Sequence, residues 1–160
     1  MVNDMLEIDI PGFGALQLEH LVCDFTGTLS VDGHLLPGVS DLLKQLAASL
    51  TVHVVTADTF ERVHEELAGH PSTVTVLSGQ NLDEQKERYI QALNADRAVA
   101  IGNGANDRLM LKAARLGIAV VEGEGCAIDA VLNADILVRN IHDGLSLLFN
   151  PQRIAATLKV

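Results

Sequence analysis

The chain contains few aromatic and few basic side chains. Aromatic residues make up 3% of its 160 residues and tryptophan is absent, so it lacks the stacking platforms on which unpaired bases bind. Lys and Arg number 11 against 21 Asp and Glu, the formal net charge is −10, and the basic residues form no cluster. Because such a surface repels phosphate backbones, we expect neither nucleic acid nor an anionic membrane to be the main partner.

Cysteines and long apolar runs are also scarce. Cys23 and Cys126 are far apart and form no CxxC pair, so neither a disulfide framework nor a zinc site is expected. No run approaches the roughly 20 consecutive apolar residues of a membrane span. The first ten residues lack the basic start and the long apolar stretch of a signal peptide. These absences predict a soluble, cytoplasmic protein.

Hydrophobic residues make up 48% of the sequence, which is enough for a single domain over residues 1–160 with an apolar core. From about residue 20, short β-branched runs alternate with segments whose apolar residues recur at helical spacing. This alternation predicts a doubly wound α/β domain with a mostly parallel sheet. The expected strands are 21–23, 51–55, 74–77, 99–101, 118–121 and 136–138, and the expected helices are 39–50, 60–67, 83–93, 107–116, 127–132, 141–149 and a short closing helix at 151–160.

A β-hairpin is expected ahead of this domain. Residues 6–10 and 15–18 alternate apolar with polar side chains on either side of Pro11-Gly12-Phe13-Gly14. We expect these two strands to pair antiparallel at an edge of the sheet.

Polar or glycine-rich segments follow three of the predicted strands. Asp24-Phe-Thr-Gly-Thr28 follows the first, Thr56-Ala-Asp58 the second, and Gly102-Asn-Gly-Ala-Asn-Asp107 the strand at 99–101. In an open parallel sheet, ligands bind beyond the carboxyl ends of the strands. A fourth position of interest is Lys86, inside the helix expected at 83–93, for which Asn81 is the expected N-cap.

The segment DFTGTL resembles the phosphorylation motif DKTGTL of P-type ATPases, and GNGANDRLML resembles the GDGxND segment of the haloacid dehalogenase (HAD) superfamily. All four segments occur in the order found in that superfamily, and the resemblance covers nearly the whole chain. It is closer still to small soluble P-type-ATPase-like proteins that lack transport and nucleotide-binding domains. The resemblance implies a HAD-like Rossmannoid fold and a Mg²⁺-dependent phosphatase that forms an aspartyl-phosphate.

The resemblance assigns a role to each segment. Asp24 is the expected nucleophile, and Lys86 supplies a fixed positive charge against the phosphoryl group. Arg88 is the rival of Lys86 but falls on another face of the helix. The hydroxyl of Thr56, the backbone N–H of Ala57 and the amide of Asn106 are the expected phosphate-binding groups.

A magnesium site is implied at the same place. The ion would take a carboxylate oxygen of Asp24, the backbone carbonyl of Thr26 and an oxygen of Asn103. Asp107 would support either the water shell of the metal or the lysine. Asn103 departs from the superfamily pattern, in which aspartate is usual, and we therefore expect a lower metal affinity unless Asp107 or another acid compensates.

Thr26 is a second departure. Phosphatases of the superfamily usually carry an aspartate there, which protonates the leaving oxygen and later takes a proton from water. General acid–base help is worth roughly 10²- to 10⁴-fold, and threonine cannot supply it. Thr26 thus predicts slow turnover that favours aryl or acyl phosphates. Phe25 fits an apolar wall.

No cap domain is expected. Only a flap at 30–34 and one helix separate Thr28 from Thr56, and one helix, one strand and a loop separate Thr56 from Lys86. The site is then open to a phosphorylated small molecule or an exposed phosphoryl group, or is closed by a second copy in a homo-oligomer.

An alternative to a phosphatase is a phospho-accepting regulatory or binding domain with vestigial turnover. A detached piece of an ion pump is disfavoured, because the chain has no membrane span and no room for a nucleotide domain.

Overall fold

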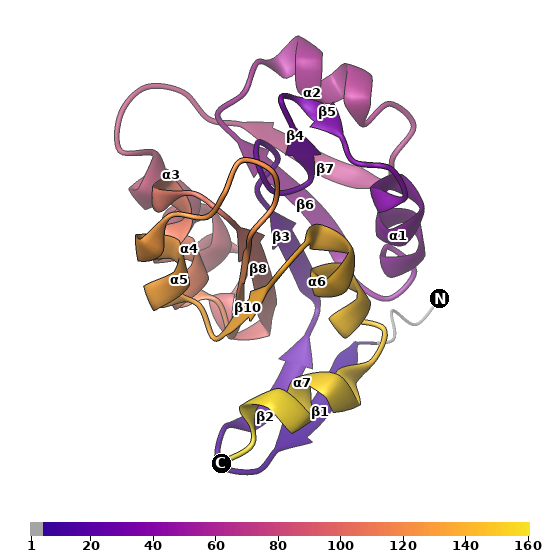
Figure 1. Ribbon diagram of the computed structural model, residues 1–160, viewed down its shortest axis with the longest axis vertical. Coiled ribbons are helices and arrows are strands. Elements are labelled where there is room, and N and C mark those ends of the chain that lie inside the picture. Colours follow the sequence, from indigo (N-terminus) through magenta and orange to yellow (C-terminus); the bar gives the residue numbers. More distant parts are fainter. Residues whose placement is uncertain (1–4) are drawn as a thin grey trace.

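The computed structural model describes residues 5–160. Its centre is a parallel sheet of six strands in the order β10-β9-β8-β3-β6-β7 (Figure 1). The chain builds the sheet outward from β3 in one direction and then returns to build the other half from β8. This confirms the predicted doubly wound α/β fold. The strands are β3 (His20–Cys23), β6 (Thr51–Thr56), β7 (Ser72–Val76), β8 (Ala98–Gly102), β9 (Leu116–Val120) and β10 (Ile136–Val138).

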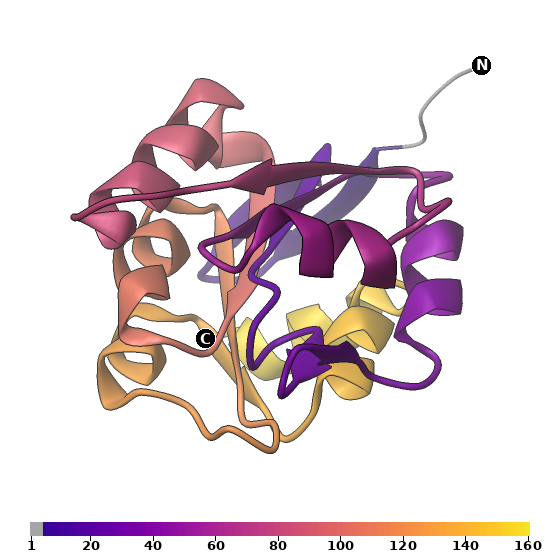
Figure 2. The ribbon, with the colours of Figure 1, turned by 90° about the horizontal axis from the view of Figure 1, so that it is seen from above.

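Helices cover both faces of the sheet, as Figure 2 shows. On one face, α1, α2 and α6 bury Val39, Val63 and Ile141 against the larger apolar cluster. On the other face, α3, α4 and α5 bury Ile90, Met110 and Ala130 in a second cluster. The helices are α1 (Val39–Leu46), α2 (Phe60–Glu66), α3 (Leu82–Ala92), α4 (Arg108–Ala113), α5 (Ile128–Asn133), α6 (Ile141–Leu147) and α7 (Pro151–Leu158), with short 3-10 turns at Ala95–Arg97 and Ala105–Asp107.

The N-terminal hairpin is antiparallel as predicted, but it is not an edge of the main sheet. Its strands β1 (Leu6–Ile10) and β2 (Gly14–Leu18) form a separate two-stranded sheet. α7 packs on β1, and the backbone N–H of Val160 donates to the carbonyl of Pro11 at 2.9 Å. The hairpin therefore packs against α7 and does not pair with an edge strand of the larger sheet.

Several predicted helices end earlier than their apolar pattern suggests. Leu116 was expected to close a helix, but it is the first residue of β9 and is fully buried. The chain leaves α4 at Ala114, whose ψ of 147° is extended. An apolar residue next to a helix satisfies the helical pattern and the strand pattern equally, so the pattern alone could not separate them.

The described residues 5–160 include no helix of the length and apolar character needed to cross a bilayer. The two intervals in which a cap was considered are short in the structure. The hairpin of β4 (Ser30–Val31) and β5 (His34–Leu35) precedes α1, and α2 and β7 lie between Thr56 and Lys86.

Candidate active site

The predicted site residues meet at the carboxyl ends of β3, β6 and β8. Asp24 follows β3 directly, and its side chain is largely buried, with 5% of the residue exposed. The backbone N–H of Asp24 donates to the carbonyl of Ile101 in β8 at 3.0 Å, so the parallel ladder continues to the carboxylate. This bond fixes Asp24 beside the turn that follows β8.

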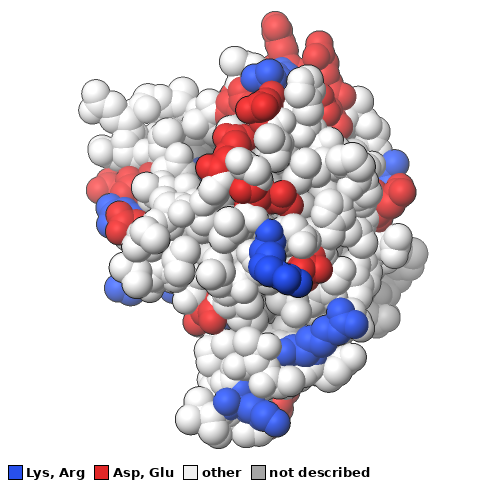
Figure 3. Space-filling view, viewed as in Figure 1, with Lys and Arg blue, Asp and Glu red and all other residues white. Residues whose placement is uncertain are grey.

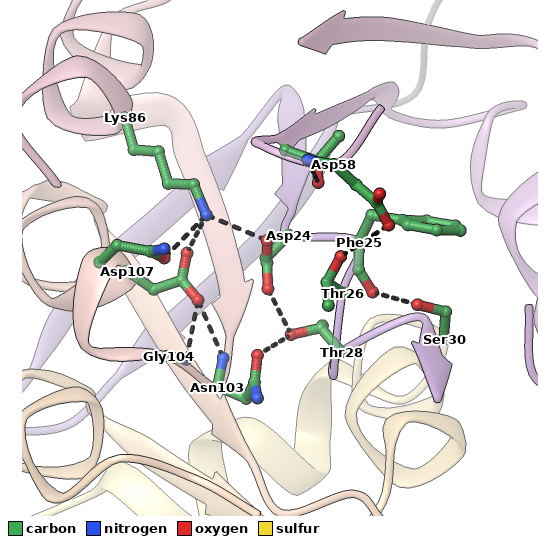
Figure 4. Close-up of polar contacts among 12 residues, drawn as sticks. Asp24, Phe25, Thr26, Thr28, Ser30, Asp58, Lys86, Asn103, Gly104 and Asp107 are labelled. Carbon is green, nitrogen blue, oxygen red and sulfur yellow. Dashed lines mark hydrogen bonds and ion pairs between the residues drawn. The ribbon is translucent and has the colours of Figure 1, made fainter. Parts of the chain in front are cut away.

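Lys86 reaches Asp24 from α3 (Figure 4). Its ammonium nitrogen Nζ lies 3.0 Å from Oδ1 of Asp24, 3.0 Å from Oδ1 of Asn106 and 2.7 Å from Oδ1 of Asp107. Arg88 lies elsewhere: its side chain is 65% exposed, and its guanidinium lies 4.0 Å from the carboxylate of Glu84. The lysine is thus the helical cation that faces Asp24.

Asp107 is fully buried behind this pair. Its Oδ2 accepts the backbone N–H groups of Asn103 at 3.1 Å and Gly104 at 2.9 Å, while Oδ1 accepts from Lys86. A Cβ at Gly102 would lie 2.5 Å from the carboxyl carbon of Asp107, which explains why glycine stands there. Of the two contacts considered for Asp107, the one with the lysine is present.

Thr28 connects the first and the last segment. Its hydroxyl lies 3.3 Å from Oδ2 of Asp24 and 3.0 Å from Oδ1 of Asn103. The amide nitrogen of Asn103 donates to the carbonyl of Gly125 at 3.2 Å. Gly27 has a φ of 79°, and a Cβ there would collide with the Asn103 amide. This close approach and the left-handed backbone both favour glycine at position 27.

β6 brings the second segment to the other side of Asp24. Thr56 is buried, and its hydroxyl accepts the backbone N–H of Asp58 at 3.1 Å. The hydroxyl of Thr26 donates to Oδ2 of Asp58 at 3.1 Å. These groups belong to one cavity of about 450 Å³, lined by Asp24, Thr26, Thr56, Ala57, Asp58, Arg62, Lys86, Asn103, Gly104 and Asn106.

The cavity contains every predicted site residue except Asp107, which lies beneath it, and it contains residues that the sequence did not single out. Asp58 stands two positions after Thr56, and this spacing was a usable signal. Arg62 comes from the first turns of α2, and nothing in the sequence pointed to it. Its guanidinium donates to the carbonyl of Asp32 at 3.2 Å, in the turn between β4 and β5.

The flap formed by β4 and β5 is held by hydrogen bonds to two other segments. The carboxylate of Glu66 in α2 accepts the backbone N–H of Leu35 at 3.1 Å. On the other side, the carboxylate of Glu124 accepts the backbone N–H of Asp32 at 3.1 Å. Together with Arg62, these contacts hold the flap between α2 and the loop after β9.

Known proteins were compared with this chain in sequence and in fold. No protein-family model matches the sequence. A 61-residue stretch is 49% identical to an uncharacterized protein of Methanocaldococcus jannaschii; it covers 38% of this chain and 66% of that protein, just under two thirds of its length. The cobalt-bound deoxy-D-mannose-octulosonate 8-phosphate phosphatase of Haemophilus influenzae superposes with a TM-score of 0.69 at 11% identity, over 89% of this chain and 94% of the enzyme.

Two further structures agree with that likeness. A protein of Legionella pneumophila described as a HAD superfamily (subfamily III A) hydrolase has a TM-score of 0.66 at 20% identity, over 88% of this chain and 87% of its own. The chain has the fold of the HAD superfamily. A Moraxella catarrhalis phosphatase with bound magnesium, phosphate and KDO has the same fold, with a TM-score of 0.59 at 17% identity over 87% and 90% of the two chains.

Burial and neighbouring charges shift the pKa values of Asp24 and Lys86. Burial, followed by the negative charge of Asp107, raises the pKa of Asp24 to about 7, against the opposing effect of Lys86. Burial alone would lower the pKa of Lys86, but the carboxylates of Asp24 and Asp107 outweigh it and raise that pKa to about 12. The lysine is therefore charged, and one cation faces two buried carboxyl groups.

Acidic side chains also gather on the surface near this end of the HAD fold. Figure 3 shows them over α2, at the top of the molecule. The sequence of α2 contributes Glu61, Glu65 and Glu66. A further positive charge at the site would thus be favoured by both its buried and its exposed surroundings.

The oxygen groups around Asp24 fit a hard divalent cation, although they provide few charges. Within residues 5–160, no group of three or more His, Cys, Asp or Glu side chains is placed to hold a metal. The donors available are a carboxylate oxygen of Asp24, the backbone of Thr26 and the amide oxygen of Asn103, which all line the cavity. Such a set suits Mg²⁺, which commonly uses one or two carboxylates and takes its remaining ligands from water and phosphate.

Proposed function

We propose that this chain is a Mg²⁺-dependent phosphohydrolase that works through an aspartyl-phosphate on Asp24. The observation that carries the proposal is the contact between Asp24 and the buried Lys86 at the carboxyl end of β3. Both residues line a cavity that Thr56 and Asn106 also line. The HAD fold supports it, since structures with this fold include phosphatases of a phosphorylated sugar acid.

The nucleophile acts by forming a bond between a carboxylate oxygen of Asp24 and phosphorus while the bond to the leaving oxygen breaks. Attack of water on the acyl phosphate then releases phosphate and restores the carboxylate. Lys86 is held against Asp24 by Asn106 and Asp107, so its charge is in place before the reaction. Thr56 and Ala57 line the same cavity, and the hydroxyl of Thr56 and the backbone N–H of Ala57 would bind phosphoryl oxygens.

Asp24, Thr26 and Asn103 would hold the metal. Bound Mg²⁺ supplies charge that offsets the phosphoryl group and the carboxylate. Asp107 would contribute through Lys86, because both of its oxygens already accept hydrogen bonds from the protein.

Turnover would be slow with leaving groups that need a proton. Thr26 lines the cavity, but its hydroxyl is not an acid at neutral pH, and it donates a hydrogen bond to Asp58. Aryl and acyl phosphates leave without protonation and would be the best substrates. Arg62 of α2 and Lys86 of α3 line the cavity, whose volume of about 450 Å³ suits a phosphorylated small molecule or an exposed phosphoryl group.

A phospho-accepting domain with little turnover is the second candidate. It is favoured by the same two positions, Thr26 and Asn103, which weaken acid–base help and metal binding. The two functions differ in the amount of phosphate released, because a stalled acceptor stops after one equivalent per chain.

Hydrolysis of para-nitrophenyl phosphate with Mg²⁺ tests both functions. We expect sustained release of phosphate beyond one equivalent per chain, and loss of turnover in Asp24→Asn with an unchanged circular dichroism spectrum. A wild-type rate in that variant would refute the nucleophile. A burst of one equivalent in the wild-type chain would instead establish the acceptor.

A further inference from the structure

The charge available to a cation at this site is smaller than the number of nearby acids suggests. Asp107 is fully buried, and its two oxygens accept hydrogen bonds from Lys86, Asn103 and Gly104 at 2.7, 3.1 and 2.9 Å. Turning this carboxylate toward a metal would break these contacts and leave the buried ammonium group with one partner fewer. Asp107 is therefore not available to make up for Asn103.

Asp58 is the other acid in the cavity, and it is also engaged. Its Oδ2 accepts from the hydroxyl of Thr26 at 3.1 Å, and its Oδ1 accepts from the backbone N–H of Thr59 at 2.7 Å. Figure 4 shows Asp58 and Asn103 on opposite sides of Asp24. An ion that contacts Asn103 would therefore not gain the charge of Asp58 as a direct ligand.

Asp24 then remains as the charged donor on the Asn103 side, and its charge is shared. Its Oδ1 is 3.0 Å from the ammonium group of Lys86, and its Oδ2 is 3.3 Å from the hydroxyl of Thr28. The oxygen of Asn103 is neutral and lies 3.0 Å from the same hydroxyl. A divalent cation arriving alone would meet one carboxylate that a lysine already neutralises in part.

We infer that this site binds a divalent cation and a phosphoryl group together, with strong positive coupling, and binds the cation weakly alone. The phosphoryl oxygens supply the negative ligands that Asn103 and the engaged Asp107 do not. Lys86 and Ala57 line the same cavity, and the ammonium group of Lys86 and the backbone N–H of Ala57 would attract those oxygens. The inference rests on the proposed function, in which both ligands occupy this cavity.

Isothermal titration calorimetry with Mg²⁺ and inorganic phosphate tests the coupling without any turnover. We expect saturating phosphate to tighten Mg²⁺ binding at least about tenfold, within the range of roughly 5- to 150-fold that is typical of coupled sites. Because such coupling is reciprocal, saturating Mg²⁺ must tighten phosphate binding by the same factor. A protein-free titration corrects for pairing of the two ions in solution.

Asn103→Asp is the matched variant. The added charge should tighten the binding of Mg²⁺ alone by about tenfold or more and reduce the coupling factor. Gln152→Glu adds the same charge on an exposed position of α7 and should leave both unchanged. Circular dichroism shows whether each variant is folded.

Equal Mg²⁺ affinities with and without phosphate in the wild-type chain would overturn the inference, as would a lack of Mg²⁺ binding under both conditions. Equal effects of Asn103→Asp and Gln152→Glu would overturn the part assigned to Asn103. This test and the test of the proposed function can give different results. Coupled binding without catalysis would support the inference and refute the proposed phosphatase activity.

Discussion

The ammonium nitrogen of Lys86 lies 3.0 Å from Oδ1 of Asp24, a residue 62 positions earlier in the chain, and both side chains are buried. The pair is completed by Asp107, whose Oδ1 lies 2.7 Å from the same nitrogen. Both buried carboxyl groups therefore share one cation, Lys86. Removal of this cation should affect both stability and activity.

We expect Lys86→Met to destabilise the protein by about 3–5 kcal/mol, because it leaves buried carboxyl groups without their cation. Loss of the fixed charge should also lower the rate of phosphate-ester hydrolysis at least about 100-fold. Urea unfolding and para-nitrophenyl phosphate turnover measure the two effects. Arg88→Met is the control on the same helix. An equal loss of stability and activity in both variants would contradict the role assigned to Lys86.

Thr26→Asp should speed hydrolysis of alkyl phosphates more than that of para-nitrophenyl phosphate, by restoring a group that protonates the leaving oxygen. The hydroxyl of Thr26 lies 3.1 Å from a carboxylate oxygen of Asp58, so a second carboxylate there would meet repulsion. We therefore expect the double variant Thr26→Asp, Asp58→Asn to be faster than Thr26→Asp alone. Acid–base help of roughly 10²-fold is the expected scale. Unchanged alkyl phosphate rates in both folded variants would contradict this account of Thr26.

Gly102→Ala should destabilise the protein by about 1–3 kcal/mol, since the new methyl group would lie 2.5 Å from the Asp107 carboxyl carbon. Displacement of Asp107 would also disturb Lys86 and lower activity. At Gly104, the nearest atom to an added Cβ is 3.4 Å away, so Gly104→Ala is a matched control with ordinary contacts. Thermal unfolding of both variants decides whether the close approach at Gly102 matters.

Stability should depend on pH through His53, a residue of β6 that does not line the site cavity. Its Nε2 lies 3.1 Å from Nδ1 of His20 and its Nδ1 lies 2.8 Å from the hydroxyl of Tyr89. Burial, followed by the proximity of His20, lowers the pKa of His53 to about 4 from its usual 6.5. The unfolded chain thus binds the proton more readily between those values, and the contribution of His53 is complete above pH 6.5 and is lost as the pH falls toward 4.

Urea unfolding between pH 4 and 7 measures this contribution. The slope due to one such group is at most about 1.4 kcal/mol per pH unit. In His53→Gln that component of the slope should disappear, whereas other titrating groups remain. Identical pH dependence of the free energy of unfolding in the two proteins would show that His53 contributes nothing.

The sequence predicted the fold well where its patterns are local. Alternation of β-branched runs with helical segments indicated the six parallel strands, and the span 136–138 was predicted with the bounds that β10 has in the structure. The pattern failed where one apolar residue suits two elements, as at Leu116, and where a segment's partner is distant, as in the hairpin that packs on α7. Asn81 is the N-cap residue as predicted, but its side chain makes no capping bond, because its backbone is left-handed with a φ of 58°.

The location of the site was also predictable, because parallel strand ends converge at one edge. Asp24, Thr56 and Asn103 lie at the carboxyl ends of three neighbouring strands and line one cavity. Most of the hydrogen bonds around the cavity were not predictable. The resemblance left open whether Asp107 supports the metal or Lys86, and the structure shows the contact with Lys86. That Arg62 of α2 approaches the flap depends on how helices pack across the sheet, and the sequence has no local signal for it.

The position of α7 on β1 bears on the order in which this protein is assembled during translation. Ile10, Leu16 and Leu18 of the hairpin are buried in the same cluster as Ile154 of α7. The hairpin precedes α7 in the sequence and is synthesised before it, so the apolar face of the hairpin is exposed to chaperones and to neighbouring chains until that helix emerges. We expect the hairpin and α7 to become ordered in a single cooperative step.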